Sequence, residues 1–171
     1  FAAADRDDLA TTAQVRSAAT QLLADPRARA RVERYHAMWL GYLELPHAAA
    51  LNQALSAETT ALVGRVIFDD GSDYLDLLRS ETTYVNDTLA AHYGLPAPGS
   101  ATPTWTSYGD SGRRGILSHG SLLSQGAKFG DTSPTIRGKW IRNMLFCQDI
   151  PPPPPTVSAD VPPPDTGSPC K

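Results

Sequence analysis

Apolar side chains recur at helical spacing along most of this chain. Between Thr11 and Leu23 they fall on one side, and Thr11 with Gln14 forms a T-x-x-Q capping box, which predicts a helix start. The pair Asp25-Pro26 is predicted to end that helix and cap the next, because an aspartate oxygen accepts backbone N–H groups and proline fits the first helical position. The second helix has the strongest pattern, and its apolar face carries Val32, Tyr35, His36, Trp39, Leu40 and Leu43.

Helical signals continue through the rest of the chain. Ser56 is predicted to cap a helix, with Glu58 favourably placed near the positive end of its dipole. Thr83 is predicted to begin another helix that ends at Gly94, a typical residue just beyond a helix. The stretch from Gly115 to Gln125 has a helical pattern of its own. Ser133-Pro134 then opens the last predicted helix.

The chain shows no convincing pair of strands and no internal repeat. We therefore predict an all-α fold, an amphipathic helical bundle followed by an extended proline-rich C-terminal arm. Five consecutive prolines follow Ile150, and such a run favours a stiff polyproline II conformation. We divide the chain into an N-terminal helical lobe (1–96), a linking loop (97–112), a helical hairpin (113–150) and the arm (151–171).

Composition excludes some classes of partner. The chain has 171 residues, of which 41% are hydrophobic, and a net charge of −3. This charge, with no run of basic residues, argues against nucleic acid as a partner. No apolar stretch approaches the roughly twenty residues that a membrane span needs. Because the chain begins at Phe1 and stops at Lys171, we expect it to be a fragment of a longer protein.

The two cysteines, Cys147 and Cys170, form no CxxC or CxxCH motif, so the chain itself can build neither a covalent c-type haem site nor a cysteine zinc site. A disulfide between them would close a loop of roughly 23 residues and stabilise the fold by about 3 kcal/mol. The alternative is one buried free thiol and one tail cysteine whose partner lies elsewhere. The acidic turn Asp69-Asp70-Gly71 lacks the spacing of a calcium loop, so we predict no metal site there.

Three side chains stand out as binding candidates, and each also has a structural explanation. His36 lies on an apolar helix face, as either a core histidine bonded to a carbonyl or a haem ligand or proton carrier. His119 lies at the edge of its predicted helix, is expected from this pattern to be more exposed than His36, and is the first candidate for a ligand or catalytic imidazole. Arg137 falls among apolar residues of the last helix. It either forms a structural salt bridge or bonds to loop carbonyls, or it recognises an anionic group such as a haem propionate.

Three segments together resemble a known family. They are residues 22–45 (LLADPRARARVERYHAMWLGYLEL), 84–96 (YVNDTLAAHYGLP) and 112–157, which includes TSPTIRGKWIRNMLFCQDIPPPPPTV. In this order they are similar to large secreted bacterial proteins that carry the paired domains of unknown function 1592 and 1588. The resemblance covers nearly the whole chain and marks Arg114-Gly115, and Ser133-Pro134 with Arg137-Gly138, as motif positions of unassigned role.

In that family a short domain with a CxxCH haem-attachment motif follows the helical domains. The resemblance therefore implies an extracytoplasmic, cytochrome c-associated setting, with cytochrome c-like partners in other domains or chains of the parent protein. Haem would belong to a neighbouring domain or chain, and Arg137, Arg114, His119 and His36 are the residues expected to touch it. The family supplies no established reaction, so no catalytic residue is assigned.

Three functions remain in competition. The leading hypothesis is the helical scaffold of a secreted, haem-associated redox protein. The alternative is a non-enzymatic structural or cell-surface interaction module that uses the proline-rich arm. An extracellular hydrolase is the least favoured, because the sequence contains neither G-x-S-x-G nor H-E-x-x-H.

Overall fold

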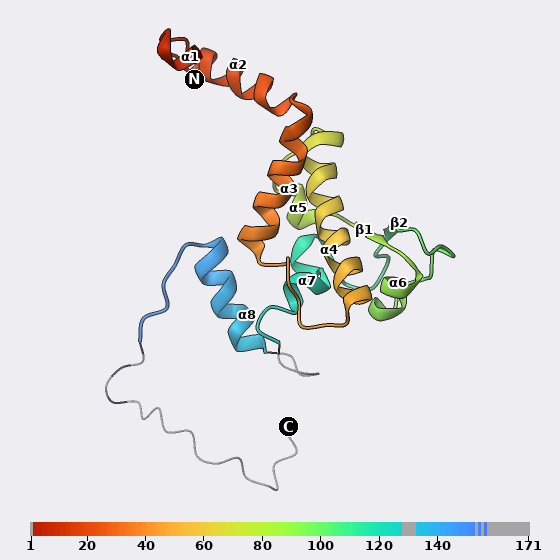
Figure 1. Cartoon of the computed structure of the whole chain (residues 1–171). Helices are drawn as coiled ribbons and strands as arrows, with labels where there is room; N and C mark the ends of the chain where they lie inside the picture. Colours follow the sequence, from red (N-terminus) through yellow and green to blue (C-terminus); the bar gives the residue numbers. More distant parts are fainter. Residues whose placement is uncertain (1, 128–132, 153, 155, 157–171) are drawn as a thin grey trace, which may run out of the picture.

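The computed structural model of the protein describes residues 2–127, 133–152, 154 and 156 (Figure 1). It begins with the short helix α1 (Ala2–Asp5), followed by α2 (Thr12–Leu23) and α3 (Pro26–Leu40). The predicted capping box is confirmed, since Gln14 N–H donates to Thr11 Oγ1 and the Gln14 side chain reaches back to the Thr11 backbone. Helix α2 extends away from the body of the protein and buries none of its residues (Figure 1).

Helix α4 (Ala49–Gly64) lies at the centre of the body and continues into the π-helix η1 (Arg65–Asp69). It packs against α3 and against three elements described below, β1, α6 and α7. It begins seven residues before Ser56, so the predicted start of that helix is wrong; the Ser56 hydroxyl instead donates to the Tyr42 carbonyl at 2.9 Å. Leu55, Leu62 and Val63 of α4 are almost fully buried and form the middle of the core.

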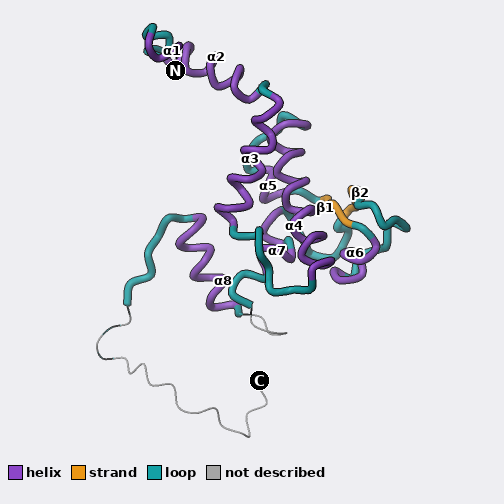
Figure 2. Tube along the Cα trace, viewed as in Figure 1, coloured by secondary structure: helices purple, strands orange, loops and turns teal. Residues whose placement is uncertain are grey.

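The prediction of an all-α fold is wrong, because the protein also contains a small antiparallel sheet. Strand β1 (Thr82–Val85) pairs with β2 (Thr104–Ser107), and Tyr84 lies opposite Trp105 (Figure 2). The fold is therefore mixed α/β, with helices predominating. Thr83 lies within a strand rather than at a helix start, since β-branched and aromatic residues favour the extended pairing of a sheet. Strand β2 lies within the predicted linking loop.

Helix α6 (Asp87–Tyr93) begins after the strand, where the Asn86 side chain accepts the Leu89 N–H at 3.0 Å. It ends as predicted at Gly94, which has a left-handed conformation with φ +68°. Before the sheet lies the short helix α5 (Asp76–Arg79).

The single helix predicted from residue 115 to 125 is wrong. The segment forms a 3-10 turn, η2 (Ile116–Ser118), followed by the four-residue helix α7 (Gly120–Leu123). The break lies at His119, whose backbone is extended. The last helix is α8 (Pro134–Trp140), with proline at its first turn as predicted, and it continues as the π-helix η3 (Ile141–Leu145).

The predicted proline-rich arm is not shown, because most of residues 151–171 lie outside the described part of the chain. Cys147 is exposed, and Cys170 lies outside the described residues, so their pairing stays a prediction. Among the helices that the structure describes, none combines the length and the apolarity that crossing a membrane requires.

Gly115 allows two backbone segments to approach each other closely. Its φ is +53°, and its N–H donates to the Ser80 carbonyl at 2.8 Å. A Cβ at this position would lie 2.3 Å from the backbone carbonyl carbon of Leu78. Glycine is therefore required here both for its conformation and for its lack of a side chain.

We predict that Gly115→Ala destabilises the protein by roughly 3 kcal/mol or more, because the backbone of η2 must separate from that of α5. Gly112→Ala is the matched control: its φ is +74°, but an added Cβ would meet nothing within 4 Å. The control should cost about 1 kcal/mol, the cost of a left-handed alanine alone. Urea unfolding of both variants measures the difference, and equal losses would contradict the close contact.

Candidate functional site

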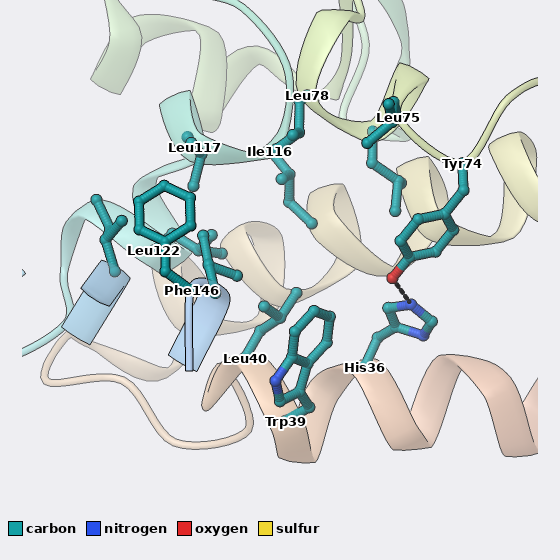
Figure 3. A pocket seen from close by; sticks show the side chains of 13 residues that line it. His36, Trp39, Leu40, Tyr74, Leu75, Leu78, Ile116, Leu117, Leu122 and Phe146 are labelled. Atoms are coloured by element: carbon teal, nitrogen blue, oxygen red, sulfur yellow. Dashed lines mark hydrogen bonds between the residues drawn. The ribbon is translucent and has the colours of Figure 1, made fainter. Parts of the chain in front are cut away.

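An apolar pocket of about 340 Å³ lies between the C-terminal half of α3, the region around α5, the η2–α7 segment and η3 (Figure 3). Its wall is almost entirely hydrocarbon, and its polar side-chain atoms are those of His36 and Tyr74, which meet at one end, and the indole nitrogen of Trp39. The lining residues are His36, Trp39, Leu40, Tyr74, Leu75, Leu77, Leu78, Ile116, Leu117, Leu122, Ile141, Leu145 and Phe146. An apolar cavity with a few localised polar groups is the usual form of a small-molecule site.

The imidazole of His36 is held by two hydrogen bonds. Its Nδ1 lies 2.8 Å from the carbonyl oxygen of Val32, one turn earlier in α3, and its Nε2 lies 2.8 Å from the hydroxyl of Tyr74. A carbonyl oxygen only accepts, so in the neutral ring Nδ1 carries the hydrogen and Nε2 accepts the proton of the Tyr74 hydroxyl. Burial raises the pKa of Tyr74, which keeps that hydroxyl protonated.

A second polar cluster lies in the core and is built around Glu58 of α4, a residue with no exposed surface. Its two carboxyl oxygens accept separate hydrogen bonds, from the hydroxyl of Thr83 on β1 and from the hydroxyl of Tyr93 on α6. The Tyr93 oxygen in turn accepts the backbone N–H of Gly120 at 2.6 Å. One side chain of α4 therefore connects β1, α6 and α7.

His119 belongs to this core cluster and is fully buried. Its Nδ1 lies 3.0 Å from the Thr59 hydroxyl, which lies 2.6 Å from the Ser121 hydroxyl. Its Nε2 lies 3.7 Å from Glu58 Oε1 and has no hydrogen-bond partner. The expectation that His119 is more exposed than His36 is therefore wrong.

Burial shifts the pKa values of the core cluster in opposite directions. It raises the pKa of Glu58 to about 7, against the lowering effects of the bonds from Thr83 and Tyr93 and of the charge of Arg113. It lowers the pKa of His119 to about 3, with a further lowering by the charge of Arg113. These shifts favour a neutral histidine and a partly protonated carboxyl near neutral pH.

The core cluster has the residue types of acid–base chemistry but no access to a substrate. Glu58, Thr59, Thr83, His119 and Ser121 are all buried, and none of them lines the apolar pocket. Its geometry therefore supports a structural role, because a general base must come within hydrogen-bond distance of a substrate.

Neither of the two candidate arginines lines the apolar pocket. Arg114 is exposed and pairs with the exposed Glu81 at 2.8 Å. Arg137 is half-buried, and one of its interactions is a bond from Nη1 to the Leu123 carbonyl at 3.4 Å. The structure therefore does not bring together the four side chains predicted to touch a haem.

Comparison with known families gives two matches in chain order. Residues 1–95 match PSD4, described as a protein of unknown function (DUF1592), over more than half of the chain. The chain belongs to the DUF1592 family. Residues 113–169 match PSCyt3, described as a protein of unknown function (DUF1588), so the suspected pairing of the two domains is confirmed. No curated protein and no solved structure matches this DUF1592 chain.

The described residues of the DUF1592 chain do not fit a haem group of its own. Both ring nitrogens of His36 are engaged, and the described lining of the apolar pocket contains no lysine or arginine to bind a propionate. His119 is enclosed in the core. Within the described residues there is also no group of three or more His, Cys, Asp or Glu side chains placed to hold a metal ion.

Sequence reasoning missed the partners that define both sites. Glu58 was interpreted as a favourable charge near a helix start, whereas it lies on the same side of α4 as Leu55 and Leu62. Its spacing of three and four residues from these leucines is a signal of burial that was present in the sequence. Tyr74 gave no such signal, since its bond to His36 joins residues 38 positions apart.

Because the folded-state pKa of Glu58 lies above its ordinary value of 4.5, the folded protein holds a proton that the unfolded chain releases. The resulting stabilisation is present below about pH 4.5 and is lost as the pH rises to about 7. By this linkage it amounts to roughly 3 kcal/mol at most.

We predict that Glu58→Gln removes this pH dependence. The stability of the wild type relative to the variant should fall by roughly 1–3 kcal/mol between pH 5 and pH 8. Urea unfolding at four pH values measures the difference, in which contributions from the other titrating groups largely cancel. Glu44→Gln, the same substitution at an exposed position, is the control. A Glu58→Gln difference that is constant or grows with pH would refute the linkage.

Proposed function

We propose that this chain is a helical scaffold within a secreted, cytochrome c-associated redox protein, and that the haem belongs to a neighbouring domain or chain. The observation that carries the proposal is the match to both families in chain order, the second of which has a cytochrome-type label. The lack of convergence among the four candidate haem residues supports a haem outside this chain. The extracytoplasmic location is part of the same proposal.

The exposed apolar face of α2 supports the proposal that this scaffold packs against another domain. Helix α2 is amphipathic and well capped, yet its apolar side chains are exposed, with Leu22 71% exposed and Val15 and Leu23 each 51% exposed. A helix with an unpartnered apolar face gains free energy when another domain covers it. We assign this face, defined by Val15, Leu22 and Leu23, to contact with the haem-bearing domain.

The other two hypotheses have less support from the described residues. An interaction module based on the proline-rich arm depends on residues that lie mostly outside the described part of the chain. A hydrolase would need an accessible acid–base pair, and Glu58 with His119 is enclosed in the core.

We predict that the chain incubated with haemin gives no stoichiometric, ligand-shifted Soret band, whereas a longer natural protein that contains it, matured with covalent haem, shows a c-type spectrum. Absorption spectroscopy of the two samples makes the comparison. A Soret shift of the chain alone that disappears in His36→Ala would contradict the proposal. So would a longer protein without haem.

The contact face is tested with the haem-bearing segment added in trans. Leu22→Glu places a charge within the apolar face and should weaken binding about tenfold or more, the equivalent of about 1.4 kcal/mol. The adjacent Gln21→Glu adds the same charge at a polar exposed position and serves as the matched control. Equal binding by both variants would show that the α2 face is not part of the interface.

A further inference from the structure

The polar end of the apolar pocket has a defined hydrogen-bonding character. His36 Nδ1 donates to the Val32 carbonyl, which leaves Nε2 as an acceptor in the neutral ring. The hydroxyl of Tyr74 therefore gives its single proton to Nε2, 2.8 Å away. A hydroxyl oxygen has two lone pairs, so the Tyr74 oxygen can still accept a hydrogen bond from a molecule in the pocket (Figure 3).

The rest of the pocket restricts the ligand further. Its other walls are leucine, isoleucine, phenylalanine and tryptophan side chains, and no charged side chain is among the described lining residues. A carboxylate or an ammonium group would lose its hydration there without gaining a partner of opposite charge. The volume of about 340 Å³ is at the lower end of the usual range for ligand sites, which suits a small molecule of one or two rings.

We infer that this pocket binds a neutral hydrophobic alcohol or phenol, whose hydroxyl donates a hydrogen bond to the Tyr74 oxygen while its hydrocarbon part contacts the apolar wall. At this end of the pocket a ketone or quinone of the same shape is disfavoured, because its carbonyl oxygen would face the lone pairs of Tyr74, whose only proton is already given to His36. The inference concerns a site distinct from the α2 face and does not depend on the proposed scaffold function.

The contribution of the hydrogen bond sets the expected selectivity. A net gain of about 1 kcal/mol for one hydrogen bond corresponds to roughly fivefold in the dissociation constant. Burial of the hydrocarbon part is the same for an alcohol and its ketone. The ratio of their affinities therefore isolates the polar end of the pocket from its apolar walls.

The test uses 2-indanol and 2-indanone. They share a carbon skeleton, and the alcohol has a hydroxyl group where the ketone has a carbonyl group. Isothermal titration calorimetry of the full chain with each compound should give tighter binding of the alcohol, by about five- to tenfold. His36→Leu removes the acceptor of the Tyr74 proton. In this variant Tyr74 becomes free to donate to the ketone, so the ratio should fall to one or below.

Tyr35→Phe is the matched control. Tyr35 precedes His36 in α3, but it is 60% exposed and does not line the pocket, so the ratio of the two affinities should keep its wild-type value. The wild-type comparison alone is decisive if His36→Leu fails to fold. Equal affinities in the wild type, tighter binding of the ketone, or no binding of either compound would each overturn the inference. None of these outcomes bears on the haem spectra, so the two proposals fail separately.

Discussion

The fold depends on the burial of one carboxyl group, that of Glu58. Removing a carboxyl from water is strongly unfavourable unless hydrogen bonds replace those lost to the solvent. Here the hydroxyls of Thr83 and Tyr93 each donate to one carboxyl oxygen, so both oxygens are satisfied. These partners come from β1 and α6, and Tyr93 also accepts the N–H of Gly120. These bonds link the small sheet to α4, α6 and α7.

The hydrogen bonds around Glu58 also position the segment that forms one wall of the apolar pocket. Gly120 begins α7, and the preceding turn η2 approaches α5 closely at Gly115. This segment contributes Ile116 and Leu122 to the pocket wall, while its polar residues face the Glu58 cluster. The η2–α7 segment therefore has two faces: a polar face toward the core cluster and an apolar face that lines the pocket. A longer regular helix from residue 115 to 125 would not have the extended backbone at His119 that separates them.

Sequence reasoning succeeded where the cause is local. The capping box of Thr11, the start at Asp25-Pro26 and the end of α6 at Gly94 follow from neighbouring residues and have the expected geometry. It failed at β1, because the strand is stabilised by pairing with residues 104–107, which the sequence presents as an irregular loop.

At the candidate site, too, the sequence predicted local features but not contacts between distant residues. His36 was identified from its position on an apolar helix face, but its partner Tyr74 was not. His119 and the two arginines stand out by residue type, but residue type carries no information about distance, and the structure does not bring these side chains together. Glu58 was explained by the helix dipole, an effect of at most about 2 kcal/mol, whereas its burial is the larger energetic term.

The two histidines illustrate how the backbone can determine side-chain chemistry. At His36 the carbonyl four residues earlier, a feature of any helix, accepts from Nδ1 and thereby makes Nε2 an acceptor. The direction of the bond to Tyr74, and with it the polarity of the pocket, follows from that single local contact. At His119 the neighbour of Nδ1 is the Thr59 hydroxyl, which can donate or accept a hydrogen bond. The Ser121 hydroxyl, which is bonded to Thr59, can likewise be either the donor or the acceptor. The tautomer of His119 is therefore coupled to a network of reorientable groups, whereas that of His36 is fixed by the helix that carries it.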